Sequence, residues 1–442
     1  MPKLSNGSAA WNGDFDNMNA EIVVVGAGPA GMAAAVRARE RGRHVLVVDD
    51  NPAPGGQIWR GGEKHTTDAG ARLWLSRFRA AEVELLSGAQ VIAADAETHT
   101  LVVETADAVH EISFRKLVIA AGSREILLPF PGWTLPGVMG AGGLQALAKS
   151  GLEVRGKRIV VGGSGPLLLA VAAYLRKHGA QVSLIAEQAP AAALAKFTMR
   201  LAGHPGKLMQ AARLQLSLAG IPYSTGCWVE AAEGHGRLER VRVRQANKVW
   251  TEACDFAAVA YGLTPNIELA NLLGCRMNGS AVSVDEFGRS SIDDVLCAGE
   301  CTSIGGVDLS LIEGEIAGYT ACGQVDQARR LFGKRQTALR FADALNEAFQ
   351  LREELRALLQ PDTLVCRCED VSFERLKNYS SFRAAKLHTR CGMGSCQGRV
   401  CGAACHFLFG WRTDSVRPPI FPARMGSLVR KEGISEEALI TK

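Results

Sequence analysis

The chain of 442 residues has few aromatic residues, at 6%, and few charged residues, at 21%, and it contains no internal repeat. Hydrophobic residues make up 47% of it, which suffices for two or three globular domains and excludes a fibrous or disordered chain. No segment reaches the ~18 to 20 consecutive apolar residues that a membrane-spanning helix needs. The first residues also lack a basic end followed by an apolar core, the pattern of a secretory signal. We therefore expect a cytoplasmic protein, and peripheral association with a membrane stays open.

The sequence also lacks the footprint of a nucleic-acid-binding protein, because no dense run of Lys and Arg with interleaved aromatic residues occurs. We therefore expect no nucleic acid partner. Charge is nevertheless uneven along the chain. Residues 361–442 contain 13 Lys or Arg and 8 Asp or Glu, an excess that equals the net charge of +5 of the whole chain.

Cysteine is absent from the first half of the chain and gathers at its end. Six of the 12 cysteines lie in this last segment: Cys366, Cys368, Cys391, Cys396, Cys401 and Cys405. In a reducing cytoplasm such clustering favours metal or iron–sulfur ligation over structural disulfides. An iron–sulfur cluster, a zinc ion and buried cysteines without a metal are the three alternatives.

A glycine motif follows the first β-branched run of the chain, residues 21–25, and opens an alanine-rich segment that reads as a helix. A second strand, residues 44–49, ends in a carboxylate. This strand–helix–strand order is the context that a dinucleotide-binding fingerprint requires, with glycines for a tight turn, for the approach of a pyrophosphate and for close helix–strand packing. The terminal carboxylate is placed to meet a ribose. The candidate contacts are Gly26, Gly28, Pro29, Ala30, Gly31 and Asp49.

A second strand–helix–strand unit begins at Arg158, but its sequence departs from the fingerprint at two positions. When Gly163 is aligned with Gly26, Leu168 takes the place of Gly31. The carboxylate of this unit, Glu187, follows one position late. A bulky residue at the third glycine position should crowd a dinucleotide, so we interpret this unit as structural, while nicotinamide binding stays open.

Three further segments end in glycines or polar groups where a strand or loop could meet a cofactor. They are the loop at residues 54–59, the strand at 116–122 and the strand at 294–300. A glycine brings backbone close to a flat ring or a phosphate, and an acidic group can hold sugar hydroxyls. We take five residues from these segments as further candidate contacts: Gly56, Gln57, Gly122, Gly299 and Glu300. No residue is assigned as catalytic, because His204 and His388 are isolated in the sequence.

Together these glycine segments resemble the two-dinucleotide-domain flavoproteins related to thioredoxin reductase, over residues 20–330. The resemblance implies FAD on the first and third pieces of the chain and an inserted second Rossmann-like domain. Two features depart from that group. Paired redox cysteines are absent, because no C-x-x-C occurs before Cys366, so disulfide reduction is not expected. The usual Asp at position 300 is Glu300.

The cysteine-rich segment resembles the [2Fe-2S] domain related to bacterioferritin-associated ferredoxin. Its pattern is C-x-C, a gap and then a second close pair. The resemblance implies four ligands: Cys366, Cys368, Cys396 and Cys401. Zinc would accept the same four sulfurs, so the identity of the metal rests on the resemblance. Cys391 and Cys405 remain without an assigned role.

The resemblances define a fold and a domain order. The fold is α/β, with two Rossmann-like dinucleotide-binding domains of the thioredoxin and glutathione reductase type and a small C-terminal [2Fe-2S] domain. The expected segments are a discontinuous FAD-binding domain (20–125 and 255–330), the inserted domain (126–254), a helical linker (331–360) and the [2Fe-2S] domain (361–442).

This combination is similar to the α subunits of bacterial hetero-oligomeric dehydrogenases that oxidise amines, a family with the A subunit of octopine or nopaline dehydrogenase, D-hydroxyproline dehydrogenase and the hydrogen cyanide synthase B subunit. The resemblance implies a partner β subunit with its own FAD that oxidises an opine or a D-imino or D-amino acid, FMN at the subunit boundary, a respiratory electron acceptor and, as a further candidate, a small γ subunit. Two alternatives stay open: a stand-alone NAD(P)H-dependent reductase, and a non-catalytic scaffold that binds ADP or ATP in place of FAD.

Overall fold

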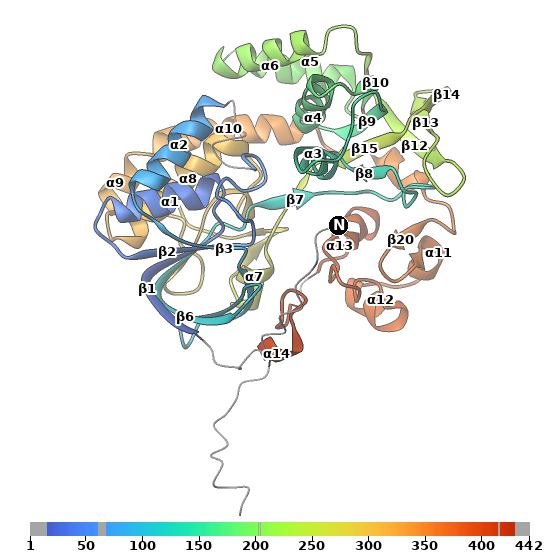
Figure 1. Cartoon of the computed structure of the whole chain (residues 1–442). Coiled ribbons are helices and arrows are strands. Elements are labelled where there is room, and N and C mark those ends of the chain that lie inside the picture. Colours follow the sequence, from blue (N-terminus) through green and yellow to red (C-terminus); the bar gives the residue numbers. More distant parts are fainter. Residues whose placement is uncertain (1–15, 61–67, 202, 204, 414–415, 429–442) are drawn as a thin grey trace, which may run out of the picture.

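The structure, a computed structural model, describes residues 16–60, 68–201, 203, 205–413 and 416–428. This part of the chain forms a first α/β unit, a second α/β unit and a smaller cysteine-rich unit (Figure 1). None of the helices in these ranges is both long enough and apolar enough to cross a membrane.

The first unit is built on a seven-stranded sheet in the order β3-β2-β1-β6-β5-β4, with β19 also paired to β6. Its strands are β1 (Asp16–Val25), β2 (Val45–Asp49), β3 (Glu84–Ser87), β4 (Gln90–Asp95), β5 (Thr100–Glu104), β6 (Val109–Ile119) and β19 (Val295–Cys297). β1 runs parallel to β2 and β6, and its apolar residues Ile22, Val23 and Val24 are buried, as in a strand covered on both faces. β6 changes partner along its length, from the antiparallel β5 at its start to the parallel β19 at its end.

Helices cover both faces of this sheet. One face carries α1 (Pro29–Arg39), α2 (Ala69–Ala80) and α8 (Gly306–Ala321), and the other carries α7 (Glu268–Leu272) and the short strands β17 (Met277–Asn278) and β18 (Ala281–Val282). α1 and α8 lie very close together. A Cβ atom on Gly314 would be 2.1 Å from the Ala30 carbonyl oxygen, and one on Gly318 would be 2.5 Å from that of Ala34. The small residues of both helices therefore permit their contact.

The second unit has a parallel five-stranded sheet in the order β11-β10-β9-β15-β8. Its strands are β8 (Val138–Gly140), β9 (Arg158–Ser164), β10 (Gln181–Glu187), β11 (Tyr223–Thr225) and β15 (Phe256–Tyr261), and its helices are α3 (Ala141–Lys149), α4 (Pro166–Lys177), α5 (Ala191–Leu201) and α6 (Pro205–Ser217). An antiparallel sheet of β12 (Cys227–Glu233), β13 (Arg240–Gln245) and β14 (Lys248–Ala253) packs beside it.

Strand β15 corrects the predicted boundary at residue 255. The prediction placed residues 255–330 in the first domain, but β15 pairs with β9 along its whole length. Its residues from Ala257 to Tyr261 are buried, so the strand completes the core of the second unit. The return to the first unit follows it, at β16 (Leu263–Pro265), which pairs with the outgoing β7 (Ser123–Glu125).

The predicted linker at residues 331–360 contains α10 (Phe332–Ala348), preceded by α9 (Val325–Arg329), and the short 3-10 helix η3 (Glu353–Leu358). The cysteine-rich unit follows, with β20 (Leu364–Cys366), β21 (Val371–Ser372), α11 (Phe373–Leu376), α12 (Phe382–Thr389) and α13 (Cys401–Phe409). These elements pack around a small apolar core that includes Phe382 and Trp411.

The end of the described chain departs from the predicted segment 361–442. Residues 416–428, which include α14 (Met425–Leu428), leave the cysteine-rich unit and run along the first unit. Ile420 is buried in the core of the first unit and donates its N–H to the Ile92 carbonyl at 2.8 Å. Arg424 pairs with Glu104 at 2.9 Å. Apolar burial and this ion pair therefore attach the segment to β4 and β5, and Arg399 of the cysteine loop also contacts it at Ile420.

Candidate cofactor sites

The glycine turn of the first unit has the geometry that its sequence requires. Gly26 has φ of +104°, and a Cβ atom there would lie 2.3 Å from the Ala120 carbonyl oxygen. A Cβ on Gly31 would lie 1.8 Å from the Gly26 carbonyl oxygen. Gly28 differs, because a Cβ there would have no neighbour closer than 3.9 Å. Gly26 and Gly31 are thus required by the fold, and Gly28 leaves space at the start of α1.

Gly28 is the N-cap of α1 and Pro29 follows it at the first helical position. No side chain caps this end, so its N–H groups and the positive end of the helix dipole are available to an anion. The loop with the next predicted contacts lies against the turn. A Cβ on Gly56 would be 2.9 Å from the Gly28 Cα, and Gly55 donates its N–H to the Ala27 carbonyl at 2.8 Å. This arrangement fits a phosphate group.

Asp49, at the end of β2, is 5% exposed and makes hydrogen bonds within the protein. One carboxylate oxygen accepts the N–H of Ala27. The other accepts the backbone N–H of Asn51 at 2.7 Å and its side-chain amide at 2.8 Å. The carboxylate is therefore fixed beside the glycine turn, where the fingerprint predicts it.

Four other predicted contacts come from three separate segments. Gly122 has φ of +68° with open space around it, Gln57 is exposed, and Gly299 begins the short 3-10 helix η2 (Gly299–Cys301). A Cβ on Gly299 would lie 2.7 Å from the Ala30 Cβ, which brings the end of β19 against the start of α1. Glu300 accepts a hydrogen bond from the Ser123 hydroxyl in β7.

The sequence analysis missed Glu313, a carboxylate in α8 that holds this region together. Glu313 is 5% exposed and accepts the Gly299 N–H and the Thr302 hydroxyl, both at 3.1 Å. Arg335 in α10 donates to it at 3.1 Å. Burial raises the pKa of Glu313, and Arg335 opposes that shift. A charged residue inside the apolar segment of α8 was the available signal.

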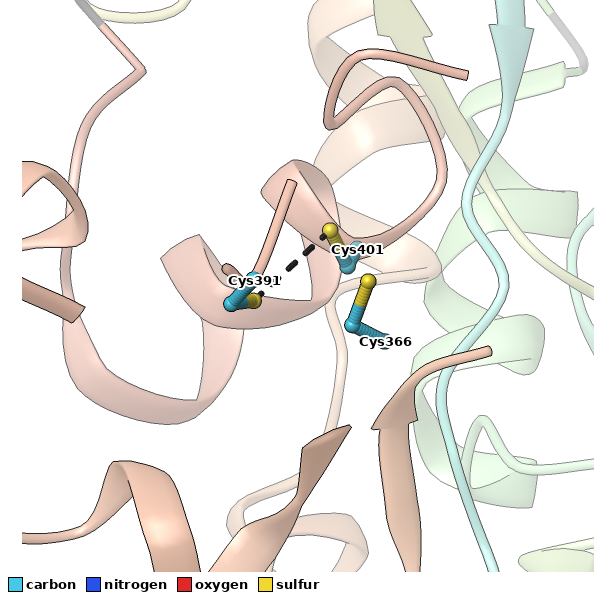
Figure 2. Close-up of side chains that lie close together, drawn as sticks. All are labelled: Cys366, Cys391 and Cys401. Atoms are coloured by element: carbon cyan, nitrogen blue, oxygen red, sulfur yellow. Dashed lines mark hydrogen bonds between the residues drawn. The ribbon is translucent and has the colours of Figure 1, made fainter. Parts of the chain in front are cut away.

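In the cysteine-rich unit the structure brings five predicted or spare cysteines together. Cys366 ends β20, Cys401 begins α13 and Cys391 follows α12, and their three sulfurs lie within 4.8 Å of one another (Figure 2). All three are buried. Cys368 and Cys396 form a second group, with 3.7 Å between their sulfurs, nearer the surface.

These spacings suit metal ligation. Two sulfurs on one tetrahedral ion lie about 3.8 Å apart, given a metal–sulfur bond of about 2.3 Å. The pair Cys368–Cys396 at 3.7 Å and the pair Cys391–Cys401 at 3.9 Å both meet this distance. The Cys366 sulfur lies within 4.8 Å of both members of the second pair. The four predicted ligands are thus divided between the two groups, and Cys391 is a fifth sulfur in the buried one.

The closeness of the three buried sulfurs shifts the pKa values of their thiols in opposite directions. Interaction with Cys391 and Cys401 lowers the pKa of Cys366 well below its ordinary value. Interaction with Cys366 is the largest cause that raises the pKa values of Cys391 and Cys401. Three thiols this close to one another are placed to bind a metal cation once they are deprotonated.

The loop between the cysteines is shaped by residues in left-handed conformations. Arg390, Gly392, Gln397 and Gly398 all have positive φ angles. A Cβ atom on Gly394 would lie 2.3 Å from the Cys368 Cβ, so only glycine allows the loop to reach this cysteine.

An arginine pair connects this loop to the first unit. Arg124 in β7 donates to the Arg399 carbonyl at 3.1 Å and pairs with Glu268 at 2.9 Å. Arg399 donates to the Cys396 carbonyl at 3.4 Å, and its guanidinium lies 3.9 Å from the centre of the Phe421 ring. Because Arg124 is adjacent to Ser123, the partner of Glu300, the two candidate sites are linked through β7.

Of the two histidines named in the sequence analysis, the structure describes only His388. His388 stacks on Tyr379 with 5.5 Å between ring centres. His204 lies outside the described residues. In the second unit Leu168 is fully buried in an apolar core.

Residues 20–330 match the pyridine nucleotide-disulphide oxidoreductase family. The chain is 31% identical to hydrogen cyanide synthase subunit HcnB of Pseudomonas aeruginosa, over 88% of this chain and 92% of that protein. It is 32% identical to the A subunit of opine oxidase from Rhizobium meliloti, over 92% of this chain and 98% of that protein.

Solved structures show the same fold. L-proline dehydrogenase from P. horikoshii covers 94% of this chain and 81% of its own at a TM-score of 0.67 and 20% identity. Lactococcus lactis thioredoxin reductase covers 70% of this chain and 99% of its own at 0.54 and 18% identity. The chain therefore belongs to the pyridine nucleotide-disulphide oxidoreductase family, in the group of subunits that includes HcnB and the A subunit of opine oxidase, as the resemblance predicted.

Proposed function

We propose that this chain is the electron-transferring subunit of a hetero-oligomeric dehydrogenase that oxidises an opine or a D-imino or D-amino acid on a partner β subunit. Electrons pass from the partner, which carries its own FAD, through this chain to a respiratory acceptor. The observation that carries the proposal is the placement of two cysteine groups, one of three residues and one of two, against a dinucleotide-binding unit, joined through Arg124 and Arg399. The names of its relatives, subunits of an opine oxidase and of hydrogen cyanide synthase, support the same reading.

In this proposal the first unit binds FAD. The start of α1 at Gly28 receives the pyrophosphate, Asp49 faces the ribose, and Glu300 contacts the ribityl chain. ADP or ATP is the alternative occupant, because the glycine turn and Asp49 concern only the ADP half of the molecule. A bound flavin supplies hydride and electron transfer, while the protein positions it.

The cysteine-rich unit binds a [2Fe-2S] cluster through Cys366, Cys368, Cys396 and Cys401. The distance between Cys368 and Cys396 supports one pair of ligands to one iron. The cluster supplies one-electron transfer. We place a further flavin, FMN, at the boundary with the β subunit, and a small γ subunit is a further candidate partner. The exposed side of Cys368 gives the cluster an edge at the surface.

An anaerobic purification tests the proposal. Visible and EPR spectra are recorded before and after dithionite, with iron, sulfide and flavin measured on the same sample. We expect two irons and two sulfides per chain, a reduced rhombic EPR signal and bound flavin. The chain alone should not oxidise opines, and co-expression with its β subunit should restore that activity. Opine oxidation by the chain alone contradicts the proposal, and colourless protein with bound zinc favours the ADP- or ATP-binding scaffold.

A stand-alone NAD(P)H-dependent reductase is the second candidate. Leu168 and the position of Glu187 argue against it, because the second unit departs from the fingerprint at both. Mixing the oxidised chain anaerobically with NADH separates the two candidates. Rapid bleaching of the flavin would favour the reductase, and an unchanged flavin spectrum supports the electron-transferring subunit.

A further inference from the structure

The carboxyl ends of the parallel strands in the second unit are where α/β sheets of this kind hold their ligands. In this chain that edge is covered by its own residues 349–352, the segment between α10 and η3. The Ser164 hydroxyl, at the end of β9, donates to the Phe349 carbonyl at 3.0 Å. Ser164 is only 3% exposed, so this contact is closed to water.

Gln188, which follows β10, makes the central contact with the segment. Its side chain is fully buried. Its amide donates to the Gln350 carbonyl at 3.2 Å and to the Ser164 hydroxyl at 2.9 Å, and its carbonyl oxygen accepts the Arg352 N–H at 3.1 Å. A fully buried side-chain amide that pairs with two backbone groups of one segment fixes that segment in position.

Side chains on both sides of residues 349–352 add to these bonds. Phe349 packs edge-on against Phe197 of α5, with 5.8 Å between ring centres. The Arg352 guanidinium lies 5.1 Å from the centre of the Trp228 ring. Leu351 packs on the core of the second unit.

The glycine turn after β9, which in a dinucleotide-binding fold meets a phosphate, is also occupied by a side chain of the chain itself. Glu187, 1% exposed, accepts the Gly165 N–H at 2.8 Å and the Ala189 N–H at 2.9 Å. Gly165 matches Gly28 of the first unit. The donor at this position is therefore bound to a carboxylate of the chain itself.

The covering segment leads directly into the cysteine-rich unit. Leu355 and Leu358 of η3 pack on the core of the second unit, and Arg356 donates to the Phe407 carbonyl of α13 at 2.8 Å. Trp133, in the second unit, donates to the Leu364 carbonyl at the start of β20. Fixing residues 349–352 thus fixes the start of the segment that carries the cysteines.

We propose that the dinucleotide crevice of the second unit is the docking site of the chain's own residues 349–352. This unit holds the cysteine-rich unit in place and does not bind a nicotinamide dinucleotide. The proposal goes beyond the electron-transferring function, because it concerns the second unit whatever cofactors the other sites hold.

Hydrogen exchange measured by mass spectrometry on the full chain tests the docking. Gln188→Ala removes the acceptor of the Arg352 N–H, and we expect exchange across residues 350–358 to rise about tenfold, the effect of one hydrogen bond. Gln245→Ala is the matched control, because the Gln245 amide donates to the Thr225 carbonyl of the same unit and not to residues 349–352. It should leave exchange at 350–358 unchanged.

A second pair of variants covers the case in which Gln188→Ala does not fold. Arg352 has φ of −79°, an angle that proline accepts, so Arg352→Pro removes the N–H without changing that angle. Arg352→Ala keeps the N–H and loses the same side chain. We expect Arg352→Pro to speed exchange at residues 353–358 about tenfold relative to Arg352→Ala. Equal exchange in the two variants contradicts the docking.

The same method tests the ligand. NADH at millimolar concentration should leave exchange at residues 158–168 and 349–355 of the wild-type chain unchanged, even if it protects the first unit. Protection of 158–168 by NADH would overturn the proposal, as would exchange of 350–355 in the free chain at the rate of an unstructured peptide.

Discussion

Gly165 donates its N–H to the Glu187 carboxylate over 2.8 Å, and this bond distinguishes the second dinucleotide fold from the first. An irregular register in β10, between Val182 and Leu184, brings Glu187 opposite Gly163 although it follows one position late in the sequence. In the first unit the strand-end carboxylate, Asp49, accepts the N–H of Ala27, one residue before Gly28. Glu is one carbon longer than Asp and reaches the next N–H along the turn. A phosphate needs that same donor at the start of the helix. One methylene group therefore separates a turn that can bind a phosphate from one that is already occupied.

The buried Glu187 predicts a pH dependence of stability. Burial raises its pKa to about 7, above its ordinary value of 4.5. A carboxyl whose pKa is higher in the folded chain contributes stability that is complete below pH ~4.5 and is lost as pH rises through ~7. Between pH 5 and pH 8 the wild type should lose about 2–3 kcal/mol relative to Glu187→Gln, measured by urea unfolding of both proteins at each pH. A difference that does not change with pH would show that the carboxyl is charged throughout this range.

Substitution of two glycines in the first turn should have two different effects, one on nucleotide binding and one on stability. Gly28→Ala places a methyl group in open space, so the chain should fold with near-normal stability but bind less flavin or adenine nucleotide. Gly31→Ala places its Cβ 1.8 Å from the Gly26 carbonyl, so α1 must shift and the chain should lose about 2–4 kcal/mol or fail to fold. Released nucleotide per chain and the midpoint of urea unfolding separate the two effects. Full nucleotide content in Gly28→Ala would place the phosphate elsewhere.

The first dinucleotide unit could be predicted from the sequence because the local backbone geometry requires its glycines. The Gly26 carbonyl of the same turn leaves no room for a side chain on Gly31, and the turn gives Gly26 a positive φ angle, so both requirements are visible in the spacing alone. The overall α/β fold and the family followed from the same motifs. The sequence also places the cysteines that the structure groups in one segment, but it left Cys391, a member of the buried group, without a role.

The errors and omissions arose where pairing is long-range. β15 is an apolar strand buried on both faces, and such a strand has no pattern that shows which of two sheets it enters. The contact of Gln188 with Arg352 joins residues 164 positions apart, so neither residue is remarkable in the sequence. The buried position of Cys391 depends on the left-handed residues of the loop that follows α12.

Cys391 gives a test of the ligand set. If the four ligands are Cys366, Cys368, Cys396 and Cys401, then Cys391→Ser should retain two irons per chain, whereas Cys368→Ser should lose most of its iron and sulfide. Both changes replace one sulfur by oxygen, and Cys405→Ser, at a buried position in α13, is the matched control. Iron, sulfide and the reduced EPR signal are measured after anaerobic purification. If Cys391→Ser loses its iron and Cys401→Ser retains it, then Cys391 is the ligand and Cys401 is not.

Glu268 contacts both arginines that join the cysteine loop to the first unit, so its substitution tests how firmly the loop is held. Its carboxylate lies 2.9 Å from Arg124 and 3.8 Å from Arg399. Burial lowers the pKa of Arg399, Glu268 opposes that shift, and Arg124 adds to it. Glu268→Gln keeps the size of the side chain but leaves the two cations without a shared carboxylate, a change that should cost about 2–3 kcal/mol in partly buried surroundings.

That cost should appear first in the loop that Arg399 holds, because the rest of each unit keeps its own core. We expect exchange at residues 396–401 to rise and iron to be lost faster to a chelator in Glu268→Gln, with exchange in β1 and β9 unchanged. Glu230→Gln is the matched control, since Glu230 also binds two arginines, Arg242 and Arg244, but lies on β12. If both variants release iron at the wild-type rate, the arginine pair has no part in holding the cysteine loop; if both release it faster, the effect is a general loss of stability.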